Sequence, residues 1–170
     1  ATVAQAAAID AFTNSGANTF NLSDTAANLA AATAAVANAA GTITATTGAT
    51  LVQATAIRGF FPAGAITYSI SDSAVNLAAA SADYVISGAA AITATTAATV
   101  AQAAAIKALT PLGATTYNLT DTTANLVAAD STAANGASVI TASDAASVAD
   151  AAVIEAFTNS GATIYNLSDS

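Results

Sequence analysis

Five aspartates recur at the same position of a sequence repeat, and their carboxylates could bind a ligand. They are Asp24, Asp72, Asp121, Asp144 and Asp169. Neighbouring Asn, Ser and Thr side chains add further oxygen atoms, and oxygen ligands of this kind suit Ca²⁺. Because an alanine-rich segment follows this phase of the sequence, the same carboxylates could instead serve as helix N-caps. Both interpretations, calcium binding and helix capping, stay open.

Two features of the sequence count against calcium at these aspartates. The chain lacks the G-G-x-G-x-D pattern of calcium-binding repeat proteins. Thr47 and Thr96 also stand where the pattern calls for Asp, and no other acidic residue compensates for them. We therefore expect no metal site and no cofactor, and keep the aspartates as the only candidates for calcium.

A second set of polar residues predicts a flat binding face. Two columns of small hydroxyl and amide side chains alternate with apolar residues, and on a strand they would point away from the core. The T-x-T pattern of Thr44/Thr46 and Thr93/Thr95 resembles the ice-binding face of some solenoid antifreeze proteins, although Asn and Ser interrupt the columns. The alternative is a ladder that only keeps the surface soluble. The predicted face consists of Asn21, Ser23, Thr44, Thr46, Ser69, Ser71, Thr93, Thr95, Asn118, Thr120, Thr141 and Ser143.

The composition excludes several classes of function. The 170 residues include two basic and ten acidic side chains, giving a net charge of −8. Binding to nucleic acid or to an anionic membrane needs clustered Lys and Arg, so we expect neither partner. The chain has no His and no Cys, the residues on which acid–base and nucleophilic catalysis most depend. We therefore expect no catalytic residue and no enzymatic activity.

Membrane insertion is a separate question, since the mean hydropathy is +0.61. No charged residue falls between Asp24 and Arg58. That stretch is nevertheless rich in Ala, Thr, Asn and Gly, which gain little from lipid. We expect no transmembrane segment.

An internal repeat organises the whole chain. The segment ATVAQAAAI occupies both residues 1–9 and 98–106, and AFTNSGA occupies both 11–17 and 156–162. One bulky residue opens each short apolar run, with gaps of 23 to 25 residues, and glycine keeps the same interval. The bulky residues are Phe20, Ile43, Tyr68, Ile92, Tyr117, Ile140 and Tyr165. Such periodicity is typical of repeat architectures.

Each repeat unit predicts a strand, a cap, a helix and a glycine turn. The runs 19–23, 42–46 and 116–120 alternate apolar and polar residues, as a half-buried strand does. Asp or Thr then follows as a predicted N-cap, and about 10 to 14 alanine-rich residues predict a helix. Glycine ends the helix, where it tolerates a positive φ.

These units predict a right-handed α/β solenoid of about seven coils, with one parallel β-sheet face and short Ala-rich helices. The alternative is a pure β-solenoid, in which the Ala-rich stretches are further strands. Stacking would place Phe20 beside Ile43 and Leu22 beside Ala45. We expect residues 1–170 to form one continuous segment of a longer repeat protein or filament.

With the block Ser23–Ala30 (SDTAANLA) and the AFTNSGA segments in view, the chain resembles Ala/Thr-rich giant bacterial surface proteins with "beta strand repeat" units. The resemblance implies secretion, a cell-surface location and a structural or adhesive role, as in a surface filament, an S-layer or sheath-like coat, or an adhesin stalk. A binding module for ice or polysaccharide is the alternative. Expected partners are further repeats, by end-to-end association or continuation in a longer chain, and surface polysaccharide.

Overall fold

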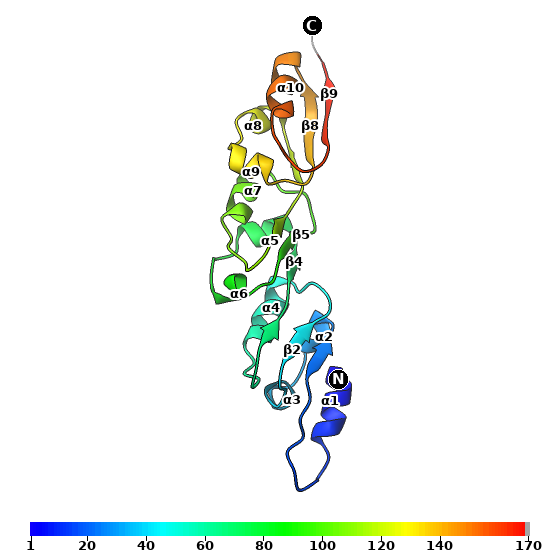
Figure 1. Cartoon of the computed structure of the whole chain (residues 1–170). Helices are drawn as coiled ribbons and strands as arrows, with labels where there is room; N and C mark the ends of the chain where they lie inside the picture. Colours follow the sequence, from blue (N-terminus) through cyan, green and yellow to red (C-terminus); the bar gives the residue numbers. More distant parts are fainter. Residues whose placement is uncertain (169–170) are drawn as a thin grey trace. The chain divides into compact units, whose positions relative to one another are not determined.

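The computed structural model describes residues 1–168, which fold as two compact units of helices and short strands (Figure 1). The first unit contains residues 1–71, 83–92 and 111–113, and the second contains residues 72–82, 93–110 and those from Ala114 onward. Helices and strands alternate along the chain, so the class is α/β.

The first unit begins with a helix and continues with short strands separated by helices. Its elements are α1 (Val3–Asp10), β1 (Leu22–Asp24), α2 (Ala26–Ala30), α3 (Ala34–Asn38), β2 (Ile43–Ala45), α4 (Leu51–Arg58), β3 (Ile66–Thr67) and α6 (Tyr84–Ser87). Strands β4 (Ile70–Asp72) and β5 (Ile92–Ala94) each contain residues of both units.

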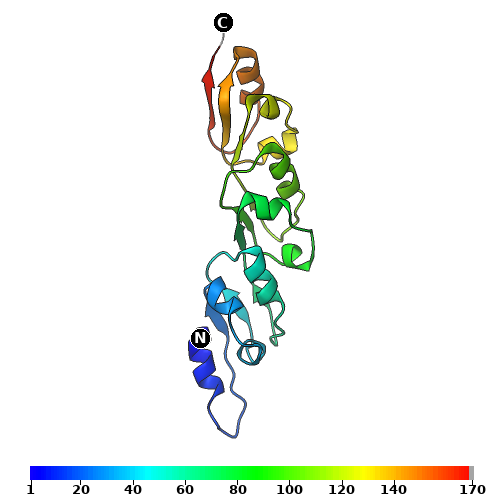
Figure 2. The same ribbon diagram turned by 180° about the vertical axis from the view of Figure 1, so that it is seen from behind.

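The second unit repeats the same alternation. Its elements are α5 (Ala74–Ala78), α7 (Val100–Lys107), β6 (Thr115–Thr116), β7 (Leu119–Asp121), α8 (Thr123–Val127), α9 (Ser131–Asn135), β8 (Ile140–Ala146), α10 (Val148–Glu155) and β9 (Thr163–Leu167). Both views place α10 on one side of β8 and β9 (Figures 1 and 2).

The predicted seven-coil solenoid with one continuous sheet is wrong. The strands form three separate three-stranded sheets, in the orders β1-β2-β3, β4-β5-β6 and β7-β8-β9. The pairs that the first and third sheets contain are parallel, as expected. The alternative of a pure β-solenoid is also wrong, because the Ala-rich stretches are helices. A filament that grows by extending one continuous sheet therefore has no support.

Two buried tyrosines mark the points where the sheets break. Tyr68 lies between β3 and β4, Tyr117 lies between β6 and β7, and each is 1% exposed. The Tyr68 hydroxyl donates to the Val85 carbonyl at 2.5 Å, and the Tyr117 hydroxyl donates to the Ala133 carbonyl at 2.6 Å. Each tyrosine is thus fixed to a short helix, while its own carbonyl accepts from the following repeat unit, from the Ala90 N–H at 2.7 Å and from the Ser138 N–H at 2.8 Å.

The strand register also differs from the prediction. Leu22 pairs with Ile43, and Leu119 pairs with Ile140, so both pairs are displaced by two residues from the expected alignment. A displacement of two residues keeps every side chain on its predicted face, because strand side chains alternate with a period of two. The core therefore still contains Leu22, Ile43, Leu119 and Ile140, each at most 1% exposed.

The Ala-rich stretches form helices of two kinds. After β2, β5 and β8 comes a single eight-residue helix, whereas after β1, β4 and β7 come two helices of four or five residues. The predicted helices of 10 to 14 residues were too long. The N-caps are Thr25, Thr50, Ser73, Thr99, Thr122 and Ser147 rather than the residues one to three positions earlier.

Several of the recurring glycines are needed for close approach, and within residues 1–168 no glycine has a positive φ. A Cβ added at Gly64 would lie 2.6 Å from the Gly41 carbonyl oxygen, and one added at Gly136 would lie 2.5 Å from the Tyr117 hydroxyl. Both distances are too short for a side chain.

No helix in the described part of the chain has the length and apolar character to cross a membrane.

Candidate functional site

Three of the recurring aspartates stand at the ends of strands, directly before helix N-caps. Asp24 ends β1, Asp72 ends β4 and Asp121 ends β7, while Asp144 lies within β8. Asp169 lies outside the described residues. The strand ends thus bring each of the first three carboxylates beside the N-terminus of the helix that follows.

Asp24 connects two helices of the first unit through its two carboxylate oxygens. Oδ1 accepts from the Thr25 N–H and from the Asn28 side-chain amide, both at 2.8 Å. Oδ2 accepts from the Val3 N–H, the first of α1, at 2.9 Å. The carboxylate therefore satisfies backbone donors that a helix N-terminus leaves without intrahelical partners.

Asp121 makes the same set of contacts in the second unit. Its Oδ1 accepts from the Thr122 N–H at 2.8 Å and from the Asn125 amide at 2.7 Å. Its Oδ2 accepts from the Val100 N–H, the first of α7, at 2.9 Å. The D-[ST]-x-x-N sequence therefore makes the same hydrogen bonds in both units.

Asp72 follows this pattern at its Oδ1. That oxygen accepts from the Ser73 N–H at 2.8 Å and from the Asn76 amide at 2.7 Å. Asp72 is 8% exposed, and its hydrogen bonds reduce the cost of placing a carboxylate at a site so poor in solvent.

The intervening units use a shorter form of the same contact. Thr47 accepts from the Ala26 N–H at 3.1 Å, and Thr96 accepts from the Ala74 N–H at 3.0 Å, both through Oγ1. Asp144 takes this place in the third instance, where its Oδ1 accepts from the Thr123 N–H and hydroxyl. Thr can replace Asp because one acceptor atom suffices here.

The pKa values of the carboxylates follow from these contacts. Hydrogen bonds from Asn28, Val3 and Thr25 lower the pKa of Asp24, and those from the Thr123 N–H and hydroxyl lower the pKa of Asp144. Partial burial raises the pKa of Asp121, but its hydrogen bonds outweigh burial, and the net pKa lies below the usual value. These carboxylates are therefore ionised acceptors at neutral pH.

The described residues contain no group of three or more His, Cys, Asp or Glu side chains that could hold a metal ion. The four recurring aspartates within residues 1–168 lie in successive repeat units, and each accepts from at least one backbone N–H group. In Asp24 and Asp121 both carboxylate oxygens accept hydrogen bonds within the fold.

The twelve residues of the predicted polar face all lie outside the core, exposed or half-buried. The strands bring Ser23 beside Thr44 and Thr120 beside Thr141. Asn21 and Asn118 do not pair with these threonines, because of the displaced register. The row in the third sheet continues from Thr141 to Ile164, which is 51% exposed and apolar. The separate sheets and this isoleucine divide the predicted continuous array.

Similar shallow hollows occur beside Asp24 and Asp121. One is about 470 Å³ and is lined by Thr2, Val3, Asp24 and Asn28, among others. Its equivalent is about 420 Å³ and is lined by Thr99, Val100, Asp121 and Asn125, among others. The polar atoms named above already hydrogen-bond to one another across these hollows. Each hollow is therefore the solvent-facing side of the hydrogen bonds that Asp24 or Asp121 makes to helix N-termini.

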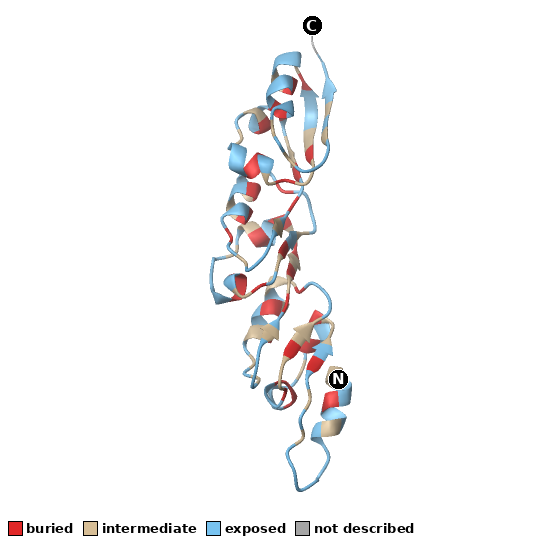
Figure 3. Cartoon of the chain, viewed as in Figure 1, coloured by how far each residue is buried: buried red, intermediate tan, exposed pale blue. Residues whose placement is uncertain are grey.

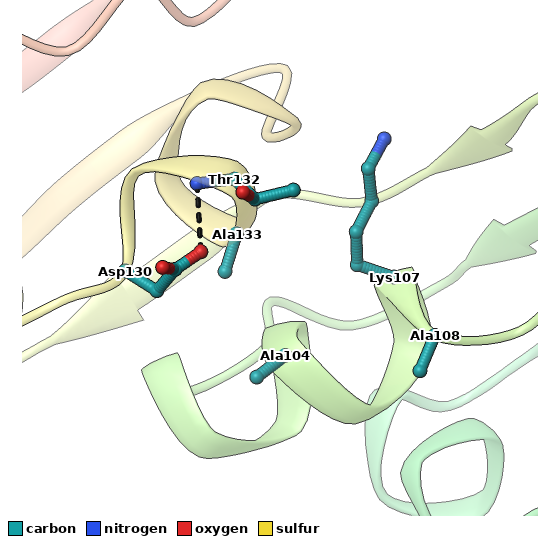
Figure 4. A pocket seen from close by; sticks show the side chains of 6 residues that line it. All are labelled: Ala104, Lys107, Ala108, Asp130, Thr132 and Ala133. Carbon is teal, nitrogen blue, oxygen red and sulfur yellow. Dashed lines mark hydrogen bonds between the residues drawn. The ribbon is translucent and has the colours of Figure 1, made fainter.

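A third hollow, of about 370 Å³, contains one of the two basic residues (Figure 4). Ala104, Lys107 and Ala108 of α7 form one wall, and Asp130, Thr132 and Ala133 at the start of α9 form the other. Asp130 accepts from the Thr132 N–H at 2.8 Å, and Lys107 points away from Asp130 (Figure 4). Three of its six lining residues are alanines, and Asp130 is engaged in capping α9.

Several residues that take part in these capping hydrogen bonds were not identified from the sequence. Asn28, Asn76 and Asn125 each bind the aspartate four residues earlier. Their signal was visible as Asn at a constant spacing after Asp. The capping boxes Thr2/Gln5, Thr50/Gln53 and Thr99/Gln102 were visible too, as the [ST]-x-x-Q pattern.

The fold and these contacts define an α/β protein in which a repeated Asp and Thr motif caps successive helices. Comparisons with protein-family models, with curated proteins and with solved structures find no match for this chain. The resemblance to Ala/Thr-rich bacterial surface proteins therefore stays a prediction.

Proposed function

We propose that this chain is a structural, non-catalytic segment of an extracellular bacterial surface protein. The observation that supports this role most strongly is the use of the repeated polar motif. The carboxylates of Asp24 and Asp121 are engaged in holding helix N-termini, and Thr47 and Thr96 do the same in the intervening units. The residues that repeat most regularly thus stabilise the fold.

The composition supports the same role. Only 7% of the residues are charged, and the chain has no Cys and no His. Small side chains predominate, which favours close packing of repeated elements over a deep, chemically varied pocket. A component of a surface coat or of an adhesin stalk fits these properties.

The experiment is to locate the protein on intact cells of its source organism. Antibodies raised against the chain should label the surface of intact cells, and the protein should fractionate with the cell envelope. Labelling that requires permeabilised cells, together with recovery in the soluble cytosolic fraction, would contradict the proposed location.

A binding module for ice or polysaccharide is the second candidate. It is favoured by the position of all twelve predicted face residues outside the core and by the neighbouring pair Thr120 and Thr141. An ice-shaping assay and a glycan array test it, with Thr141→Lys as the disrupting variant and Thr132→Lys on α9 as the control. Binding that Thr141→Lys abolishes and Thr132→Lys keeps would favour this candidate. Absence of ice shaping and of glycan binding would remove it.

We further propose that the chain needs no calcium and no other cofactor. The hydrogen bonds that Asp24 and Asp121 accept support this view. The melting temperature should be the same with added Ca²⁺ and with a chelator. A rise in the melting temperature on adding Ca²⁺ would contradict it.

A further inference from the structure

The apolar face of α1 is less covered than the same face of the other eight-residue helices. The isoleucines Ile57 of α4, Ile106 of α7 and Ile154 of α10 are fully buried, at 0% exposure. The equivalent Ile9 of α1 is only half-buried. Since the four helices share one sequence pattern, their neighbours and not their sequences cause this difference.

The loop after α1 gives a sharper comparison, because its sequence occurs twice. Residues 11–17 and 156–162 both read AFTNSGA. Both form the same local turn, in which Asn14 donates to the Gly16 carbonyl and Asn159 donates to the Gly161 carbonyl, each at 3.0 Å. Phe12 is nevertheless 66% exposed, whereas the equivalent Phe157 is half-buried.

The loop at residues 156–162 is the better buried of the two, and its contacts show which element covers it. Helix α10 packs on α8. In its loop, the Thr158 N–H donates to Asn135 Oδ1 of α9 at 2.8 Å, and the Ser160 N–H donates to the Ala137 carbonyl at 3.3 Å. The α8–α9 segment of the preceding repeat unit therefore covers α10 and its loop.

The first unit contains an independent instance of the same contact. Helix α4 packs on α2. The Phe61 N–H donates to Asn38 Oδ1 of α3 at 2.8 Å, and the Ala63 N–H donates to the Ala40 carbonyl at 3.1 Å. Within residues 1–168, the equivalent Thr13 N–H of the first loop has no such partner.

We propose that the face formed by Ile9, Phe12 and the Thr13 N–H, the α1 docking face, receives one further repeat unit of the α8–α9 type. This unit would precede Ala1 in the same polypeptide. It would bring a leucine like Leu126 against Ile9, and an asparagine like Asn135 to accept from the Thr13 N–H. In Figure 3, the helix beside the N mark, α1, carries mostly exposed and intermediate colouring.

A preceding unit fits this face better than a second copy of the chain. In each copy Asn38 and Asn135 already accept from their own loops. Leu29 and Leu126 are also buried, at 1% and 0% exposure. Leu77 of α5, which packs on α7, is buried as well. Within residues 1–168 a separate copy therefore presents no free segment of this type unless it unfolds one of its own contacts. The inference does not depend on where the protein is located or on its proposed structural role.

The test is an extended chain in which a copy of residues 119–145 precedes Ala1. The copy joins in phase, because Ala146 is the equivalent of Ala1 in the repeat. Phe12→Trp, introduced in both the extended and the original chain, reports on burial of the face. In the extended chain we expect a blue-shifted tryptophan emission. We also expect amide exchange in α1 at least about tenfold slower, the effect of burying a large apolar side chain.

The matched control is the same extension carrying Leu126→Asp and Asn135→Ala within the copied segment. It should leave the tryptophan exposed and α1 exchange fast, while exchange in α10 confirms that the rest of the chain is folded. Equal emission and exchange in the extended and original chains would overturn the proposal, as would equal protection by the control extension. A blue shift that depends on the concentration of the original chain would assign the face to a second copy and would also overturn it.

Discussion

At the scale of single residues, the chemistry of this chain lies in how its carboxylates are used. Asp121 accepts three hydrogen bonds, from the Val100 and Thr122 N–H groups and from Asn125. Hydrogen bonds to a charged acceptor are stronger than those between neutral groups. Removal of the carboxylate leaves helix N-terminal donors without their partner.

Asp121→Ala should therefore lower the free energy of unfolding at pH 7 by about 1–2 kcal/mol. Chemical denaturation measures this change. The control is Asp10→Ala, at the exposed last residue of α1, where a negative charge is unfavourable next to the helix C-terminus. That variant should stay within about 0.5 kcal/mol of the wild type or be slightly more stable. Equal losses in both variants would contradict the capping role.

The same variant carries a prediction about pH. The folded-state pKa of Asp121 lies below its usual value, so its contribution to stability is present above about pH 4 and is lost as the pH falls through the folded-state pKa. The stability difference between the wild type and Asp121→Ala should therefore shrink at low pH. Denaturation curves from pH 7 to below about pH 3 test this, and a difference that stays constant would show that the charge is not responsible.

At the scale of elements, a tyrosine and a glycine together hold a short helix against the strand region. The Tyr117 hydroxyl reaches the Ala133 carbonyl of α9 because Gly136 leaves room for it. Tyr117 lies between β6 and β7, which belong to different sheets, and β7 pairs with β8. The hydroxyl contact thus ties this part of the chain to α9.

Gly136→Ala should lower the free energy of unfolding by about 1–3 kcal/mol, because its Cβ would meet a buried hydroxyl that has little freedom to move. Gly16→Ala is the control, since the nearest atom to its Cβ would be Asn14 Nδ2 at 3.7 Å. We expect that variant to stay within about 0.5 kcal/mol of the wild type. Adding Tyr117→Phe to Gly136→Ala should cost less than the sum of the two single changes, and strict additivity would contradict the proposed clash.

At the scale of the whole molecule, the burial of equivalent residues depends on their neighbours. Leu119 and Leu167 occupy the same place in their repeat units, yet Leu119 is 0% exposed and Leu167 is 59% exposed. Identical local sequences around them, Tyr-Asn-Leu, give different environments. The same difference separates Phe157 from Phe12.

Leu119→Ala should destabilise the second unit by about 2–5 kcal/mol, the usual cost of a large-to-small change in a core. Leu167→Ala should cost less than about 0.5 kcal/mol, because its side chain already contacts solvent. Thermal and chemical denaturation of the two variants measure the contrast. Similar losses in both would show that Leu167 is covered in solution.

The sequence by itself determined the α/β class, the alternation of short strands with Ala-rich helices, and which strand residues face the core. These properties depend on local periodicity and propensity, which any single repeat unit contains. The position of the aspartates beside helix N-termini was predictable as well. The choice of Thr25 and Thr122 as N-caps was not, because Asp and the residue after it are both good caps and neighbouring donors decide between them.

Only the tertiary structure decided the division into three sheets, the strand register and the environment of each equivalent residue. A seven-coil solenoid follows if every unit pairs with the next in the same way. The strands instead divide into three sheets, and at the two boundaries Tyr68 and Tyr117 donate to backbone carbonyls 17 and 16 residues away. Such contacts depend on distance in space and on the room that glycine leaves. Asp24 and Asp121, met first as candidate ligands for calcium, accept hydrogen bonds from the first N–H groups of α1 and α7 in the fold.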